Sequence, residues 1–147
     1  MRVSLQTYLV SFDCDTGDIP PEYEISSCEE AVPFLKEIFK TLDADKEHFI
    51  ILGLDPKLKV LNYKVVATGY IGGCPVHPRE VFSAAIELRS TSLIISHNHP
   101  TGNVEPSNED IHLTRKLKEC GGILGIPILD HIIMTPFGEF KSLINLI

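Results

Sequence analysis

Two histidines separated by one residue are the most chemically distinctive feature of the sequence. His97 and His99 follow an apolar segment, residues 92–96, and Asp110 lies eleven residues beyond His99. If the chain leaves the strand pleat at the histidines and the loop folds back, two imidazoles and one carboxylate can converge. Three such ligands, with a fourth position open to water, are typical of a catalytic zinc site, where the metal lowers the pKa of that water.

A helix cap accounts for some of the same residues. Ser107 and Asp110 have the spacing of an N-cap serine and an acid at the third helical position, where both can bond free backbone N–H groups. An acid in the first turn also interacts favourably with the helix dipole. Because HxH is a short motif that occurs often by chance, the spacing leaves both interpretations open.

The first expected helix has two competing start signals. Ser27 and Glu30 have the spacing of a capping box, and apolar residues then recur at helical intervals as far as Leu42. Pro33 lies inside that segment, where a proline removes a backbone hydrogen bond. We therefore expect the regular helix to begin nearer Val32, with Pro33 in its first turn.

Strands and helices alternate through the rest of the chain. Pro78 opens one expected helix, and another runs from Ser107 to the Gly121-Gly122 pair. Apolar runs bounded by turn residues predict strands at residues 49–54, 59–68, 92–96 and 128–134, with an edge strand after a turn at 136–138. This alternation predicts a mixed α/β fold in which helices flank a central sheet.

The composition limits the class of protein. The 147 residues suit one domain, and the net charge of -7 argues against a surface for nucleic acid, which would need an excess of Lys and Arg. No apolar run reaches the ~20 residues of a membrane helix, and the N-terminus lacks a signal-peptide pattern, so we expect a cytoplasmic protein. The four cysteines form no CxxC pair, which predicts free thiols and argues against a zinc ribbon or a redox motif.

Several blocks of sequence resemble one protein family. HNHPTGNVEPSNED, residues 97–110, resembles the JAMM motif of JAB-domain metalloproteins, and the nearest likeness is to the RadC-like bacterial branch. Blocks at residues 47–55, 76–82 and 129–133 follow the same family pattern in the same order. The resemblance implies a single JAB/cytidine-deaminase-like domain over residues 25–147. Residues 1–24 are expected to add an N-terminal strand and an acidic loop to that domain.

The resemblance also implies a role for each site residue. It makes His97, His99 and Asp110 the ligands of one zinc ion per chain. Glu47 matches the acid that holds and deprotonates the attacking water, and Ser107 matches the serine that stabilises the developing oxyanion. The residues alone do not single out Glu47, since the neighbouring acids at positions 43 and 45 are equally good candidates.

The remaining histidines are given other roles. His77 precedes Pro78 and is predicted to be a helix-cap or packing residue rather than a ligand. His131 lies in an apolar strand and is predicted to be a hydrogen-bonded core residue, with a bond to a zinc ligand as an option. His48 and His112 are predicted to lie on the surface.

The function expected from the resemblance is zinc-dependent hydrolysis of an amide or isopeptide bond, with a peptide or protein as substrate. A nucleic-acid-linked role, suggested by the DNA-repair label of RadC-like proteins, is the first alternative and is disfavoured by the charge. A non-catalytic interaction module is the second. A zinc nucleoside deaminase is excluded because the chain has neither HxE nor PCxxC in the required arrangement.

Overall fold

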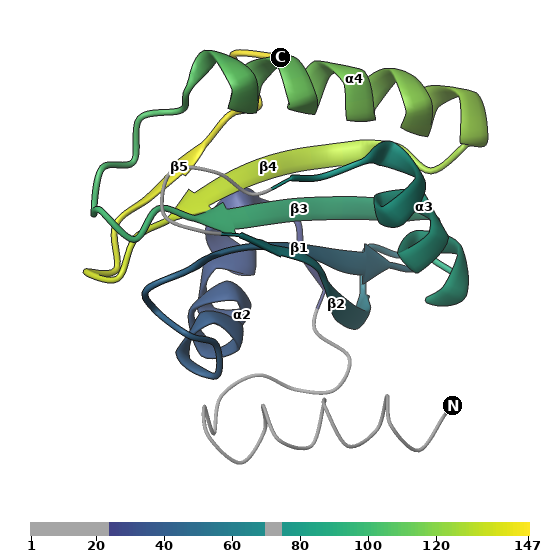
Figure 1. Cartoon of the computed structure of the whole chain (residues 1–147). Coiled ribbons are helices and arrows are strands. Elements are labelled where there is room, and N and C mark those ends of the chain that lie inside the picture. Colours follow the sequence, from purple (N-terminus) through teal and green to yellow (C-terminus); the bar gives the residue numbers. More distant parts are fainter. Residues whose placement is uncertain (1–23, 70–74) are drawn as a thin grey trace.

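The structure is a computed structural model that describes residues 24–69 and 75–147. In chain order its elements are α2 (Cys28–Lys40), β1 (Glu47–Leu54), β2 (Val60–Gly69), α3 (Pro78–Glu87), β3 (Ser92–Asn98), α4 (Asn108–Leu124), β4 (Ile128–Met134) and β5 (Phe140–Ser142) (Figure 1). The strand and acidic loop expected before residue 24 lie outside the described residues. So do the side chains of three of the four cysteines, while the fourth, Cys120, is a free thiol.

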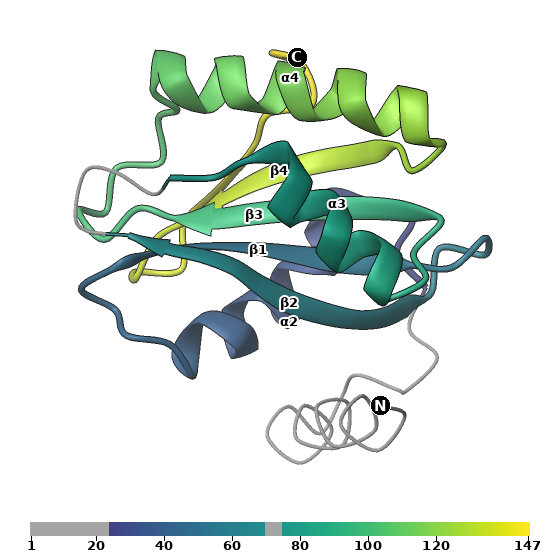
Figure 2. The same ribbon diagram turned by 45° about the vertical axis from the view of Figure 1, so that its right-hand side comes forward.

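A five-stranded mixed sheet forms the centre of the fold, in the order β2-β1-β3-β4-β5. Strand β1 is antiparallel to both β2 and β3, β3 is parallel to β4, and β4 is antiparallel to β5. Helix α2 covers one face, and α3 and α4 cover the other (Figures 1 and 2). The predicted mixed sheet flanked by helices is therefore confirmed. No helix in the described segments is long and apolar enough to cross a membrane.

The strands supply apolar side chains to both faces of the sheet. On the α2 face the core includes Ile50, Leu52, Leu54, Ile94, Ile132 and Met134, together with apolar residues of α2. On the α3/α4 face it includes Phe49, Ile51, Leu93, Ile95, Ile126 and Ile128, together with apolar residues of α3 and Leu117 of α4. Because side chains alternate along a strand, even-numbered residues of β1 and β3 face α2, and odd-numbered residues face α3 and α4.

Helix α2 begins earlier than expected, at Cys28, so that Pro33 lies inside the helix. The predicted capping box is also wrong: Ser27 makes no side-chain cap bond, and the Glu30 carboxylate accepts bonds from the N–H and hydroxyl of Ser26. Pro33 lies on the exposed side, whereas Phe34 and Leu35 are buried. Burial of such side chains stabilises by about 1.5–3 kcal/mol each, which offsets the ~3 kcal/mol that an interior proline costs.

Helix α4 extends past the predicted end at Gly121-Gly122 and finishes at Leu124. Its C-cap is Gly125, with φ 72°, a left-handed conformation that glycine adopts without steric strain. Gly121 has a different role, because a Cβ atom there would lie 2.5 Å from the backbone oxygen of Ile126. The sequence offered several glycines in this stretch, and the one in the left-handed conformation ends the helix.

Candidate metal centre

Strand β3 carries the two histidines to the edge of the α4 face. The strand runs to Asn98, two residues beyond the predicted end at Ser96, so His97 lies within it and His99 directly follows it. The regular strand therefore ends between the two histidines. His97 and His99 share one face because they are two residues apart, and the side chain of Asn98 points to the opposite face.

Asp110 reaches the histidines from the first turn of α4, which is N-capped by Ser107. The Asp110 backbone N–H donates to Ser107 Oγ at 3.0 Å, and the Ser107 N–H donates to Asp110 Oδ2 at 2.9 Å. Asp110 Oδ1 also lies 3.4 Å from His97 Nε2, and Oδ2 lies 3.4 Å from His99 Nε2. The capping box predicted for these two residues is present, and it orients the carboxylate toward both imidazoles.

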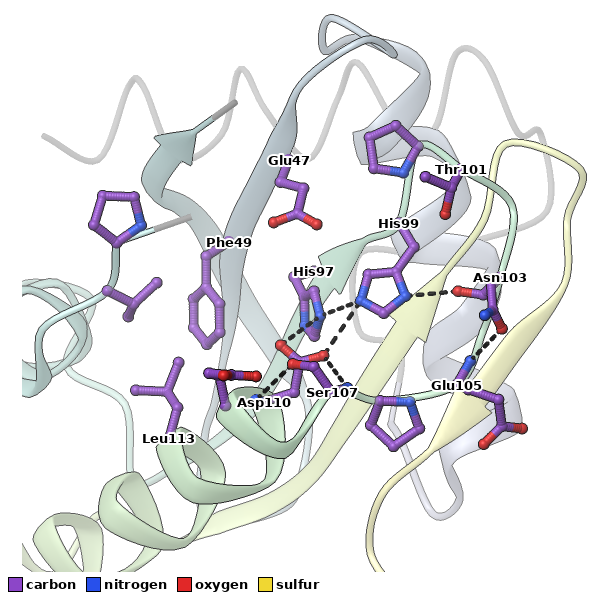
Figure 3. Close-up of a pocket in the computed structure, with 15 residues that line it drawn as sticks. Glu47, Phe49, His97, His99, Thr101, Asn103, Glu105, Ser107, Asp110 and Leu113 are labelled. Carbon is purple, nitrogen blue, oxygen red and sulfur yellow. Dashed lines mark hydrogen bonds and ion pairs between the residues drawn. The ribbon is translucent and has the colours of Figure 1, made fainter. Parts of the chain in front are cut away.

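One ligand atom from each of these three side chains lies within 4.8 Å of the others. The Nε2 atoms of His97 and His99 are 2.9 Å apart. Figure 3 shows both rings and the Asp110 carboxylate turned toward one another at the bottom of the pocket. Two imidazole nitrogens and a carboxylate oxygen that converge in this way are a donor set suited to zinc.

A chain of hydrogen bonds orients the imidazole of His97. The Thr114 hydroxyl donates to the Asp110 carbonyl at 2.6 Å and so must accept at 2.6 Å from Nδ1 of His131. The fully buried His131 is neutral, because burial and then the charge of His97 lower its pKa well below the ordinary value. Its Nε2 therefore accepts from His97 Nδ1 at 2.7 Å. This arrangement leaves Nε2 of a neutral His97 as the free ligand atom.

His99 is oriented by a simpler contact. Its Nδ1 lies 2.6 Å from the backbone oxygen of Asn103. A carbonyl oxygen can only accept, so Nδ1 carries the proton and Nε2 is the ligand atom of the neutral ring. Both histidines thus present the same nitrogen toward Asp110.

Burial and the imidazoles act in opposite directions on the acids. Burial would raise the pKa of Asp110, but hydrogen bonds from the Nε2–H groups that His97 and His99 carry when protonated outweigh it and hold that pKa well below its usual range. The same bond with Asp110 raises the pKa of His99, and burial opposes it. Burial raises the pKa of Glu47, and the charges of His97 and His99 oppose that shift. Asp110 is thus held as an anion, and Glu47 is the more basic carboxylate.

Glu47 and Ser107 both line a pocket of about 970 Å³ that contains the three converging residues. Glu47 is the first residue of β1, and its carboxylate points into the pocket above His97 (Figure 3). The acids at 43 and 45 are exposed in the loop before β1 and are absent from the lining. Ser107 Oγ accepts the Asp110 N–H, which leaves its hydroxyl proton available for another acceptor.

The family of the chain follows from comparison with known proteins. Residues 25–145 match the RadC-like JAB domain. The chain belongs to this family. It is 48% identical over 95 residues to a UPF0758 protein of Staphylococcus haemolyticus, and 41% identical over 126 residues to one of Staphylococcus carnosus. These alignments cover 65% and 86% of this chain, but 42% and 54% of the relatives. The chain therefore spans about half the length of the curated relatives it matches.

The structure of this RadC-like JAB domain also tests the roles given to the other histidines. His77 is the N-cap of α3 and accepts from the Arg79 N–H, as predicted, and His131 is the predicted core residue bonded to His97. The surface position predicted for His48 is wrong, since its side chain is buried between Thr68 and the Asp43 carbonyl. Thr114 was not anticipated. Its position four residues after Asp110 is the only sequence signal for its contact with that carbonyl.

Proposed function

We propose that this RadC-like JAB domain is a zinc-dependent hydrolase that cleaves amide or isopeptide bonds in peptides or proteins. The observation that carries the proposal is the convergence of His97, His99 and Asp110 in one pocket whose wall also contains Glu47. Three N and O ligands with an open side are the arrangement of catalytic rather than structural zinc sites.

The chemistry of the converging groups supports a bound cation. When both rings are neutral, the hydrogen bonds at Nδ1 leave the Nε2 lone pairs of His97 and His99 facing each other at 2.9 Å. In the neutral rings these lone pairs repel one another, and the adjacent Asp110 carboxylate adds negative charge. A divalent cation held by His97, His99 and Asp110 would remove this repulsion.

In the proposed hydrolysis, Glu47 transfers protons and Ser107 stabilises the developing negative charge. A bound zinc ion supplies Lewis acidity, which lowers the pKa of water and polarises a carbonyl. Glu47 accepts the proton of the attacking water at its carboxylate, for which its raised pKa is suited, and it can then pass that proton to the leaving nitrogen. The Ser107 hydroxyl donates to the substrate oxygen as negative charge develops there.

The pocket is consistent with a peptide segment as substrate. Its volume of about 970 Å³ is at the upper end for small-ligand sites. Apolar side chains, including Phe49, Val76 and Leu113, line it beside the polar groups. A segment of extended peptide can contact these side chains while its carbonyl approaches Ser107 and Glu47.

Glu47→Gln tests the proposal. The amide keeps the size of the side chain but cannot accept a proton, so the variant should keep one zinc per chain and lose roughly 10²–10⁴-fold in turnover. Zinc is measured by elemental analysis of protein purified without an affinity tag, and turnover on a panel of peptide and isopeptide substrates. The exposed Asp43→Asn is the matched control and should be fully active.

Three outcomes would contradict the proposal. Wild-type protein that neither contains zinc nor binds it on titration would remove the metal. Loss of zinc in Glu47→Gln would make Glu47 a ligand. Retention of both zinc and full activity would place the base elsewhere.

A further inference from the structure

One buried side chain holds the peptide groups on both sides of Glu47. Asn98 Oδ1 accepts from the His48 N–H at 2.7 Å, and Asn98 Nδ2 donates to the Lys46 carbonyl at 2.9 Å. Only 7% of Asn98 is exposed. Glu47 lies between these two bonds, so its backbone is fixed from both sides by a residue of the neighbouring strand.

The contact occurs where the pairing of β1 and β3 ends. Paired residues run from Leu54↔Ser92 to Phe49↔His97. Beyond that point β3 stays paired with β4 as far as Asn98↔Met134, and the His99 N–H donates to the Met134 carbonyl at 2.8 Å. The side-chain amide of Asn98 then offers β1 a donor and an acceptor, as a peptide group of a longer β3 would.

The position of Asn98 connects the metal ligands to the proposed base. It lies between His97 and His99 in the chain, and the two imidazoles face α4 while its own side chain lies on the α2 face, where it lines a second pocket with Met134. Asn98 therefore does not take part in the convergence of ligand atoms. Two hydrogen bonds therefore link the residue between the histidines to the backbone on both sides of Glu47.

We propose that Asn98 is a positioning residue that sets the location of the Glu47 carboxylate relative to His97 and His99. The inference rests on the proposed function, in which Glu47 is the base. Asparagine suits this role because it carries a donor and an acceptor on one rigid planar group. Aspartate at this position could accept from His48 but would place a second acceptor against the Lys46 carbonyl, and alanine would leave both backbone groups without partners.

The experiment compares Asn98→Ala and Asn98→Asp with Glu47→Gln and with a matched control, Ser96→Ala. Ser96 lies on the same face of β3, is buried, and donates to the Ile132 carbonyl at 2.6 Å, so its loss also removes a buried bond to a neighbouring strand. Each zinc-loaded variant is titrated with acetohydroxamate. This small chelator has N–H and O–H groups that can donate hydrogen bonds to a carboxylate beside the metal. Zinc affinity is measured separately, and turnover is added for any substrate found.

Asn98→Ala should weaken acetohydroxamate binding and turnover roughly 10-fold or more, the usual range for residues that orient a site. Its zinc affinity should stay close to that of the wild type, and Asn98→Asp, which keeps the acceptor for His48 but loses the donor to Lys46, should show a defect of the same kind. In the Glu47→Gln background, Asn98→Ala should add little, because both changes act through one carboxylate. Ser96→Ala should lower stability without changing acetohydroxamate affinity.

Two results distinguish a failure of the positioning role of Asn98 from a failure of the proposed function. If Glu47→Gln weakens turnover or acetohydroxamate binding while both Asn98 variants leave them unchanged, the positioning role is wrong and the proposed function stands. If Glu47→Gln changes neither quantity, the assignment of Glu47 fails, and the role of Asn98 fails with it. A loss in Ser96→Ala as large as in Asn98→Ala would show that the effect is one of general stability, and would also overturn the inference.

Discussion

At the level of a single residue, the Asp110 carboxylate caps α4 and also faces the imidazoles of His97 and His99. Asp110→Ala should abolish tight zinc binding and destabilise the metal-free protein by about 1 kcal/mol through the lost cap. Asp110→Asn keeps an oxygen for the Ser107 N–H but removes the charge, so it should lose zinc affinity with a smaller loss of stability. Zinc titration and denaturant unfolding at alkaline pH, where His99 is neutral, measure the two effects.

The neighbouring Glu109 provides the control for that pair. It lies in the same first turn of α4 and is exposed. Glu109→Gln should change neither zinc affinity nor stability appreciably. Unaltered zinc affinity in Asp110→Asn would mean that the residue is a cap alone.

His99 should make the protein respond to pH in opposite ways with and without zinc. Its hydrogen bond to Asp110 raises its pKa above the ordinary value of 6.5. Because the folded-state pKa is the higher one, the stabilisation from this pair is fully present below about pH 6.5 and is lost as pH rises through the folded-state pKa. Zinc needs the deprotonated ring, so zinc affinity should instead rise over the same interval.

Thermal unfolding of the metal-free protein and zinc titrations, run at the same series of pH values, check this prediction. Asp110→Asn removes the partner that raises the pKa of His99 and should flatten the stability profile. Wild-type and Asp110→Asn proteins whose metal-free stabilities change alike between pH 6.5 and pH 8 would contradict it.

The three side chains that converge were more predictable than the residues that hold them in place. His97, His99 and Asp110 follow from their types and spacing together with a family resemblance, and the structure brings them together. Asn98 and Thr114 each make two side-chain hydrogen bonds, Asn98 to backbone groups on both sides of Glu47 and Thr114 to the Asp110 carbonyl and His131. Such contacts depend on strand register and helix docking, which local patterns do not specify.

At the level of elements, the two adjacent glycines of α4 offer an internal comparison. A Cβ at Gly121 would lie 2.5 Å from the Ile126 backbone oxygen, whereas a Cβ at Gly122 would meet no atom within 4 Å. Gly121→Ala should destabilise the protein by roughly 1–3 kcal/mol through overpacking against the chain leading into β4. Gly122→Ala should stabilise it by up to about 1 kcal/mol, because alanine has the higher helix propensity.

Denaturant unfolding measures the free energy of unfolding of both variants. Because both gain the same helix propensity, the difference between them reports the contact of Gly121 with Ile126. A stabilised Gly121→Ala would show that the α4–β4 connection can shift to accept a methyl group. The same comparison explains the prediction that failed: the sequence contains the glycine pair but does not show that one member touches the chain after the helix.

Elements with unambiguous boundaries were predicted well. Strand β4 occupies residues 128–134 as expected. Strands β1 and β2 form the predicted hairpin, and the Asp55 carboxylate accepts from the backbone N–H groups of Lys57 and Lys59 in the turn. The start of α2 was missed because tertiary burial outweighs the local effect of Pro33. Strand β3 was cut short at Ser96 because its last residues, His97 and Asn98, are polar yet buried.

At the level of the whole molecule, the site lies where the topology brings the ends of several elements together. The end of β3 meets the start of β1, which is antiparallel to it, and α4 begins beside both in the connection to the parallel strand β4 (Figure 1). Clefts at the carboxyl ends of parallel strands are common places for ligands in α/β folds. The order of strands and helices was readable from the sequence, whereas this convergence required the fold.

At the same level, the negative charge of the chain predicts that this protein binds nucleic acid weakly. The net charge is -7, and the charged groups that line the large pocket are Glu47, Glu105, Glu109 and Asp110 beside the two histidines. A phosphodiester backbone would meet these carboxylates. No Lys or Arg is among the described lining residues to neutralise phosphates and so release counterions from the DNA.

We expect no specific complex with duplex DNA at ~150 mM salt and a weak dependence of any residual binding on salt. Fluorescence anisotropy with zinc-loaded protein measures this, and the charge-reversed double variant Glu105→Lys/Glu109→Lys should bind more tightly than the wild type. Nanomolar binding by the wild-type chain would show that the net charge hides a local basic surface, and would favour the nucleic-acid-linked role over peptide hydrolysis.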